Sequence, residues 1–166
     1  MIGVLDVHYT GDVAWAACVL AGEWAASESL ARHVVRVEGI APYVPGAFYQ
    51  RELPALLEVL AAVDERPEVL VVDGYVWLDG GAPGLGAHLH SRVGEAMPVV
   101  GIAKNPYDGA TDAVEVLRGG STRALWVSAV GMRVEDAVAA VRSMAGEHRI
   151  PKLVREVDQV ARAAGG

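Results

Sequence analysis

Met1-Ile-Gly-Val-Leu-Asp6 is an apolar run that ends in a carboxylate, and a second run of the same kind is Val69-Leu-Val-Val-Asp73. Apolar runs of this length that precede helical patterns are typical of buried parallel strands. In open α/β sheets, ligands bind outside the carboxyl ends of such strands. Two aspartates at two such ends are costly to bury unless a cation pairs with them. Glu52 lies between the two runs, where a helix should begin, so three carboxylates are candidates for a catalytic metal site.

The rest of the chain predicts a mixed α/β sheet covered by helices. Turn signals separate three strands before the first helix, as in an antiparallel meander, and helices then alternate with strands. Leucines at helical spacing mark the apolar face of the first helix: Leu53, Leu56, Leu57 and Leu60. We expect strands at residues 1–9, 13–21, within 23–37, 69–73, 99–103, 114–117 and 124–130, and helices at 47–63, 84–95, 134–145 and 151–163.

Size and composition limit the function classes. At 166 residues the chain is long enough for a sizeable core, and we expect one domain, residues 1–166. No apolar stretch reaches the ~18 residues needed to span a bilayer, so we expect no membrane partner. The lone cysteine, Cys18, and the lack of a basic segment before the first apolar run fit a cytoplasmic location. The net charge of −7 does not suggest a nucleic-acid binder. It does not exclude a metal-dependent nuclease, because bound cations reverse the charge of clustered carboxylates.

Five short motifs, in this order, resemble the endonuclease V family. They are Asp6-Val7, Pro42-Tyr-Val-Pro-Gly46, Arg51-Glu52, Val72-Asp73-Gly74 and Gly101-Ile-Ala-Lys104. Later segments, Trp126-Val-Ser128 and Arg149-Ile-Pro151, are also similar to that family. The most specific of these motifs is Tyr-(Ile/Val)-Pro-Gly placed six residues before a glutamate. The resemblance covers most of the chain and implies a ribonuclease H-like fold, in agreement with a mixed sheet flanked by helices on both faces.

The resemblance also implies an activity. Members of that family are metal-dependent endonucleases that cut DNA or RNA near deaminated bases, chiefly inosine, on the 3′ side. It therefore implies a nucleic-acid partner and Mg²⁺ or Mn²⁺ as the cofactor. By the same resemblance, the residues near the metals are Asp6, Glu52, Asp73 and Asp158, with Lys104 beside the active site. The implied substrate-binding residues are a wedge, Pro42, Tyr43, Val44 and Pro45, and two glycines, Gly46 and Gly74, that line a pocket for a flipped base.

These residue types suit phosphodiester hydrolysis. Two metals roughly 3.5–4 Å apart activate a water and stabilise the departing oxyanion, and Mg²⁺ prefers oxygen ligands such as Asp and Glu. Lys104 would act as a point charge on a phosphate oxygen. The prolines around Tyr43 make it a rigid wedge because each proline fixes φ. Glycines let the backbone approach a purine closely.

The segment after Gly74 departs from the family pattern. Asp79 and Gly81 stand where the family has the histidine and arginine of a His-Pro-Arg segment. A carboxylate beside a substrate channel repels phosphate, although Asp79 is also interpretable as a turn residue or an added metal ligand. Trp77 is interpretable as a core residue or as a platform that stacks on a base. Two other functions therefore stay open: a catalytically weakened or repurposed binding module, and a hydrolase of a small phosphoester.

Overall fold

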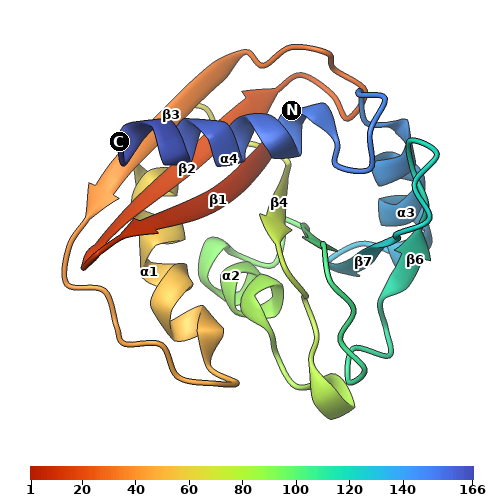
Figure 1. Ribbon diagram of the computed structural model, residues 1–166, viewed down its shortest axis with the longest axis horizontal. Coiled ribbons are helices and arrows are strands. Elements are labelled where there is room, and N and C mark those ends of the chain that lie inside the picture. The colour runs from red at the N-terminus through yellow and green to blue at the C-terminus, as the bar shows by residue number, and fades with distance from the viewer.

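The fold is a seven-stranded mixed sheet with helices on both faces (Figure 1). The computed structural model describes residues 1–166. The strands are β1 (Ile2–Thr10), β2 (Val13–Ala21), β3 (Ala31–Val37), β4 (Val69–Asp73), β5 (Val99–Ala103), β6 (Val114–Val116) and β7 (Leu125–Val130). They lie in the order β3-β2-β1-β4-β5-β7-β6. β4 pairs in parallel with both β1 and β5, and every other neighbouring pair is antiparallel.

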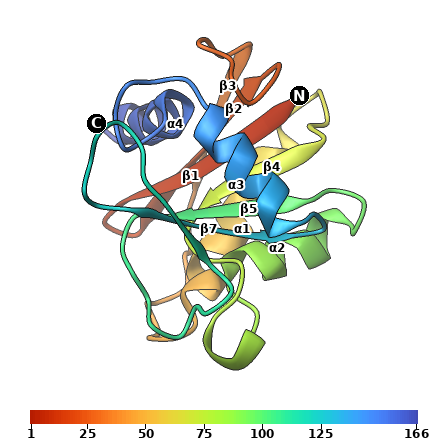
Figure 2. The same cartoon turned by 90° about the vertical axis from the view of Figure 1, so that its right-hand side faces the viewer.

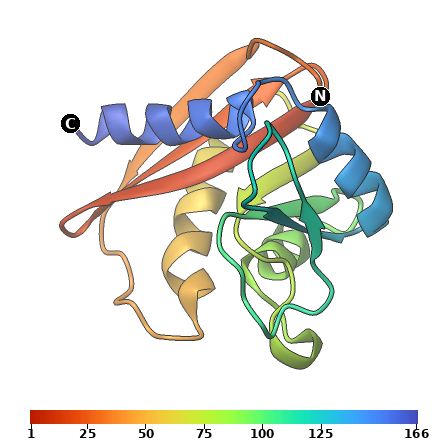
Figure 3. The same cartoon turned by 45° about the vertical axis from the view of Figure 1, so that its right-hand side comes forward.

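Two helices cover each face of the sheet, as Figures 2 and 3 show. The helices are α1 (Phe48–Ala61) and α2 (Leu85–Val93) on one face, and α3 (Val134–Ser143) and α4 (Lys152–Ala164) on the other. Two cores result, because successive residues of a strand point to opposite faces. In β1, Leu5 belongs to the core under α1 and α2, whereas Val4 belongs to the core under α3 and α4.

β1 and β4 separate beyond Val4 and Val71, so that β4 ends at Asp73 while β1 continues to Thr10 (Figure 1). Their parallel pairing extends only from Ile2 opposite Val69 to Val4 opposite Val71. Further along, Asp6 stays paired with Ala17 of β2, and Asp73 stays paired with Ile102 of β5. Each aspartate therefore lies two residues past the last β1–β4 pair. The two aspartates thus flank one opening, as the apolar runs predict, but only Asp73 lies at a strand end, because β1 continues past Asp6 to Thr10.

The element boundaries agree with the sequence-based expectations to within a few residues. The third strand, Ala31–Val37, lies within the expected segment 23–37, and the residues before it form turns and bends. Glu52 lies in the second turn of α1 instead of at its start, because the helix already begins at Phe48. The strands expected at 114–117 and 124–130 form the antiparallel β6–β7 pair. None of the helices combines the length and hydrophobicity that a bilayer crossing requires.

Candidate active site

Asp6, Glu52 and Asp73 line one small cavity, too narrow for a water molecule as the side chains stand, between the middle of β1 and the carboxyl end of β4. The apolar side chains that complete its lining are Leu5, Val7, Leu56, Val72 and Leu85. Glu52 reaches the cavity from α1 and is only 7% exposed, whereas the two aspartates are partly exposed. The structure thus brings together the three carboxylates that the sequence singles out.

Negative charge in this cavity is only partly compensated. Burial, and then the nearby Asp73 carboxylate, raise the pKa of Asp6 to about 7, although the Val7 N–H donates to Asp6 Oδ1 at 2.9 Å. Burial, and then Asp6 and Asp73, raise the pKa of Glu52 well above its usual range. Glu52 Oε2 is buried and accepts no hydrogen bond. A bound cation would stabilise such an oxygen beside like charges.

Lys104 follows β5 directly and lies next to Asp73. Its Nζ donates to Asp73 Oδ2 at 3.0 Å, and the two side chains are 31% and 38% exposed, respectively. Burial alone would lower the pKa of Lys104, but the charge and hydrogen bond of Asp73 outweigh burial and raise it. A cation therefore lies at the edge of the carboxylate cavity.

Asp158 lies on α4 and is not among the residues that line the cavity. Its charge makes a minor contribution to the raised pKa of Asp6, after those of burial and Asp73, so the two carboxylates are within electrostatic reach. The Nε of Arg162 donates to both Asp158 oxygens, at 2.9 and 3.0 Å. The structure thus places Asp158 near the three carboxylates but pairs it with an arginine.

The donor set in the cavity suits a hard divalent cation. Asp6, Glu52 and Asp73 offer only carboxylate oxygens, which Mg²⁺ and Mn²⁺ prefer. The unpaired Oε2 of Glu52 is the specific feature that fits such an ion. As they stand, the side chains do not form a ready-made group of three or more ligands. At least one carboxylate would therefore have to turn for all three to bind.

Residues 42–46 form an exposed loop that leads into α1. Tyr43 and Val44 are 60% and 45% exposed, respectively. Gly46 has a φ of 79°, a left-handed conformation that costs glycine little. The Ala47 N–H donates to the Val44 carbonyl at 3.0 Å and closes the turn before the helix. The tyrosine of the predicted wedge is therefore accessible to a partner.

An aromatic pocket of about 250 Å³ adjoins the carboxylate cavity and shares Leu85 with it. Its lining residues are Gly46, Phe48, Tyr49, Gly74, Tyr75, Leu78, Gly84, Leu85 and Tyr107. Gly46 and Gly74, to which the resemblance to the family assigns a base pocket, are both among them. Sequence reasoning missed the aromatic walls, which come from three separate segments. The available signal was that Tyr75 and Tyr107 each lie a few residues past the carboxyl end of a predicted strand.

Trp77 and Asp79 both make contacts that hold loops in place. Trp77 Nε1 donates to the Ala129 carbonyl at 3.2 Å, and the Trp77 backbone forms a β-bridge with Pro83. Trp77 therefore anchors its loop to β7. Asp79 Oδ2 accepts a hydrogen bond from the Tyr107 hydroxyl at 2.7 Å and does not line the carboxylate cavity. These contacts favour the turn interpretation of Asp79 over a metal ligand.

Two arginines that the sequence did not single out as site residues support the loops around the site. The Arg149 guanidinium donates to the backbone carbonyls of Lys104 and Ala124. The buried Arg118 donates to the carbonyls of Met144 and His148 after α3. Arg149 thus fixes the backbone that carries Lys104, while Arg118 fixes the segment that leads to Arg149.

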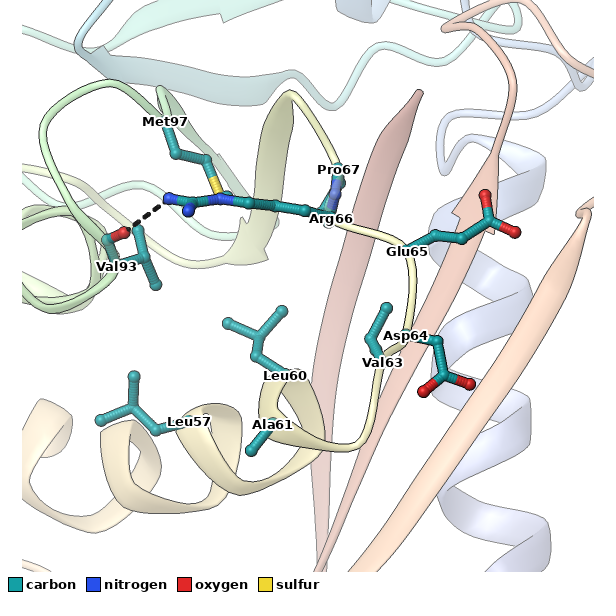
Figure 4. A pocket seen from close by; sticks show the side chains of 10 residues that line it. All are labelled: Leu57, Leu60, Ala61, Val63, Asp64, Glu65, Arg66, Pro67, Val93 and Met97. Atoms are coloured by element: carbon teal, nitrogen blue, oxygen red, sulfur yellow. Dashed lines mark hydrogen bonds between the residues drawn. The ribbon is translucent and has the colours of Figure 1, made fainter.

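A larger hollow, of about 380 Å³, lies at the other end of the layer formed by α1 and α2 (Figure 4). It is lined by residues from the carboxyl ends of these helices and from the segments before β4 and β5, including Leu60, Val93 and Met97. Arg66 Nη2 donates to the Val93 carbonyl at 3.0 Å along its rim. No candidate site residue lines this hollow, so the candidate active site is the carboxylate cavity with the adjoining aromatic pocket.

Comparison with known proteins agrees with this geometry. The family model described as Endonuclease V matches residues 1–129, which include Asp6, Glu52, Asp73 and Lys104. The chain belongs to the Endonuclease V family. An Endonuclease V of Roseiflexus castenholzii is 32% identical in an alignment 178 positions long, which covers 95% of this chain and 78% of that protein. The family is one of nucleases, and the resemblance seen in the motifs is confirmed.

Solved Endonuclease V structures share the fold. The crystal structure of the Streptomyces avermitilis Endonuclease V has a TM-score of 0.82 at 29% identity, covering 98% of this chain and 80% of that one. A Ciona intestinalis Endonuclease V in complex with a 24mer DNA containing an inosine has a TM-score of 0.81 at 17% identity, covering 98% and 84%. At that identity the second likeness concerns the fold alone. The predicted ribonuclease H-like sheet is confirmed.

Proposed function

We propose that the chain is a divalent-metal-dependent endonuclease that hydrolyses a phosphodiester bond on the 3′ side of inosine in DNA or RNA. The observation that carries this proposal is the buried, unpaired Oε2 of Glu52 in a cavity shared with Asp6 and Asp73. Membership of the Endonuclease V family, whose Ciona intestinalis member was solved in complex with inosine-containing DNA, supports the choice of substrate.

The three cavity carboxylates would hold Mg²⁺ or Mn²⁺. When bound, such ions supply an activated water and charge stabilisation for the departing oxygen. Lys104, which Asp73 holds at 3.0 Å, would place its positive charge against a phosphate oxygen. Asp158 would act from α4 through its charge, with its position fixed by Arg162.

Substrate binding would use the wedge loop and the aromatic pocket. Tyr43, between Pro42 and Pro45, would enter the duplex beside the damaged base, together with Val44. Flipping a base out costs a few kcal/mol, and less for a mispair. The flipped base would enter the aromatic pocket, where the backbones of Gly46 and Gly74 allow close approach.

The direct test is cleavage of end-labelled oligonucleotides that contain a single inosine, as DNA and as RNA, with Mg²⁺ or Mn²⁺. Wild type should nick 3′ to the inosine, and Asp6→Asn should lose at least a hundredfold in rate because a charged ligand is lost. Asp12→Asn, an exposed aspartate in the β1–β2 turn, is the matched control and should cleave normally. Failure of wild type to nick either strand, or equal nicking by Asp6→Asn, would remove the proposal.

A further inference from the structure

The aromatic pocket has two walls whose rings are fixed by different contacts. Tyr49 stacks on His88 with ring centroids 3.6 Å apart and an interplanar angle of 18°. On another segment, Tyr107 is 42% exposed, and its hydroxyl donates to Asp79 Oδ2 at 2.7 Å. Asp79 lies in the loop after β4, whereas Tyr107 lies in the loop after β5. A single hydrogen bond thus ties together the two loops that flank this side of the pocket.

Two further contacts hold the same loops against each other. The Tyr75 hydroxyl donates to the Asn105 carbonyl at 2.5 Å, and the Tyr75 and Tyr107 rings are 5.9 Å apart. A Cβ at Gly109 would lie 1.4 Å from Asp79 Oδ1, so no larger residue fits there while Asp79 keeps its place. The carboxylate of Asp79 is therefore held between the Tyr107 hydroxyl and the Gly109 backbone.

We propose that Asp79 is a positioning residue: its hydrogen bond with the Tyr107 hydroxyl, which we call the clasp, fixes the Tyr107 ring and thereby sets which bases the aromatic pocket accepts. This inference rests on the proposed function and assigns a role to a residue that departs from the family pattern. The pocket lining contains four aromatic rings and no charged side chain. Such a lining favours a flat, neutral guest that stacks on the rings, as a purine base does.

Fixing the ring matters because a mobile wall must be ordered each time a base binds. A wall that is ordered in advance does not incur that cost. Because the Tyr107 ring is partly exposed and contacts the Tyr75 ring only at a tilt, its hydroxyl bond to Asp79 is the directional interaction that limits its rotation toward solvent. Without the clasp, the pocket would still exist, but it would distinguish less well between a base that fits and one that does not.

The experiment compares variants that separate the clasp from the charge. Asp79→Ala removes both, and Asp79→Asn removes the charge but keeps an oxygen that accepts from Tyr107. Tyr107→Phe keeps the ring and removes the donor, and Tyr107→Ala removes the wall. Asp108→Ala is the matched control, because it removes a neighbouring exposed carboxylate that makes no side-chain hydrogen bond to Tyr107. Dissociation constants for short inosine and adenosine strands are measured by fluorescence anisotropy without metal, and KM and kcat are measured with Mg²⁺.

The clasp predicts that Asp79→Ala and Tyr107→Phe each narrow the preference for inosine over adenosine by about threefold to tenfold. The double variant should lose no more of the preference for inosine than either single variant, because both substitutions remove the same hydrogen bond. Asp79→Asn should keep the preference of wild type for inosine over adenosine, whereas Tyr107→Ala should reduce that preference about tenfold or more. In the cleavage assay, the loss of preference should appear in KM more than in kcat. A purely electrostatic role for Asp79 gives the opposite pattern and overturns the inference. In that case Asp79→Asn equals Asp79→Ala, both tighten all strands alike, and Tyr107→Phe has no effect.

The two proposals fail in different ways. If wild type cleaves inosine strands but the Asp79 and Tyr107 variants keep their preference, only the clasp is wrong. If wild type prefers inosine in binding but never cleaves, and Asp79→Ala loses that preference, the clasp stands and the endonuclease proposal is wrong.

Discussion

Lys104 Nζ donates to Asp73 Oδ2 at 3.0 Å, so one of the three cavity carboxylates already has a cationic partner. The other two, Asp6 and Glu52, have no basic side chain within hydrogen-bond distance, and both have a raised pKa. The uncompensated charge of the site is therefore concentrated on these two residues. The first two predictions follow from this uneven distribution.

Without metal, stability should fall as the pH rises through the range in which Asp6 ionises. A carboxyl group whose pKa is higher in the folded than in the unfolded state takes up a proton on folding, so its ionisation favours unfolding. For Asp6 this range extends from about 4, the ordinary value, to about 7. Asp6→Asn should reduce the difference in unfolding free energy between pH 5 and pH 8 by on the order of 2 kcal/mol. Urea unfolding in EDTA at the two pH values measures this difference for wild type and Asp6→Asn. If the difference is the same in both proteins, the pKa of Asp6 is not raised.

Divalent cations should stabilise the protein more at pH 8 than at pH 5, because protons compete with the metal for the same oxygens. At a Mg²⁺ or Mn²⁺ concentration about a hundredfold above Kd, the expected rise in Tm is about 5–10 °C at pH 8. Glu52→Gln should lose most of this rise while Asp12→Asn keeps it. Equal shifts in Glu52→Gln and wild type would place the ion elsewhere.

Tyr43 should matter for duplex substrates and not for single strands, because only a duplex has to be opened. We expect Tyr43→Ala to cut inosine in duplex DNA about tenfold or more slowly than wild type, with single-strand cleavage little changed. Tyr43→Phe keeps the ring and serves as the control. If cleavage of both substrates falls equally, Tyr43 contributes general binding instead of strand opening.

Gly101 in β5 should not tolerate a side chain. A Cβ there would lie 2.4 Å from the Gly74 carbonyl oxygen and 2.9 Å from Ser128 Oγ. Gly101→Ala should therefore lower the unfolding free energy by about 1–3 kcal/mol and displace the backbone next to Asp73. Gly22→Ala is the matched control, because the nearest atom to its Cβ is 3.9 Å away. Equal stability of the two variants in urea unfolding would show that the sheet adapts without strain.

Arg118 should contribute strongly to stability although it lies outside the candidate active site. Its buried guanidinium donates to the carbonyls of Met144, Gly146, His148 and Arg149. Arg118→Met leaves these acceptors without a partner and should cost about 2–4 kcal/mol in urea unfolding. Arg155→Met, on the exposed face of α4, should change stability by less than about 0.5 kcal/mol. A similar cost for both variants would mean that water replaces Arg118.

The carboxylate cavity could be predicted from sequence because its geometry follows from local patterns. An apolar run predicts a buried strand, and Asp6 and Asp73 each end such a run. Only Asp73 also ends its strand, whereas Asp6 lies in the middle of β1 and is freed by the separation of β1 from β4 after Val4 and Val71. Glu52 was placed by its motif, but its burial depends on how closely α1 packs against the sheet, which no local pattern determines.

The contacts between loops could not be predicted, because they join residues that no local pattern relates. The hydrogen bond between Asp79 and Tyr107 spans 28 positions, and that between Arg149 and the Lys104 carbonyl spans 45. Asp79 read alone is a turn residue or a repelling charge. Only the docking of the loop after β5 against the loop after β4 makes it a hydrogen-bond partner for an aromatic wall.

The separation of β1 from β4 has a mechanical consequence. The sheet consists of two parts, β3-β2-β1 and β4-β5-β7-β6, which are joined by only three residue pairs between β1 and β4. Asp6 and Asp73 lie just past that seam, one on each part, and two like charges there push the parts away from each other. A cation bound by both aspartates would link the two parts across the β1–β4 junction, so that metal binding would also make the sheet more rigid.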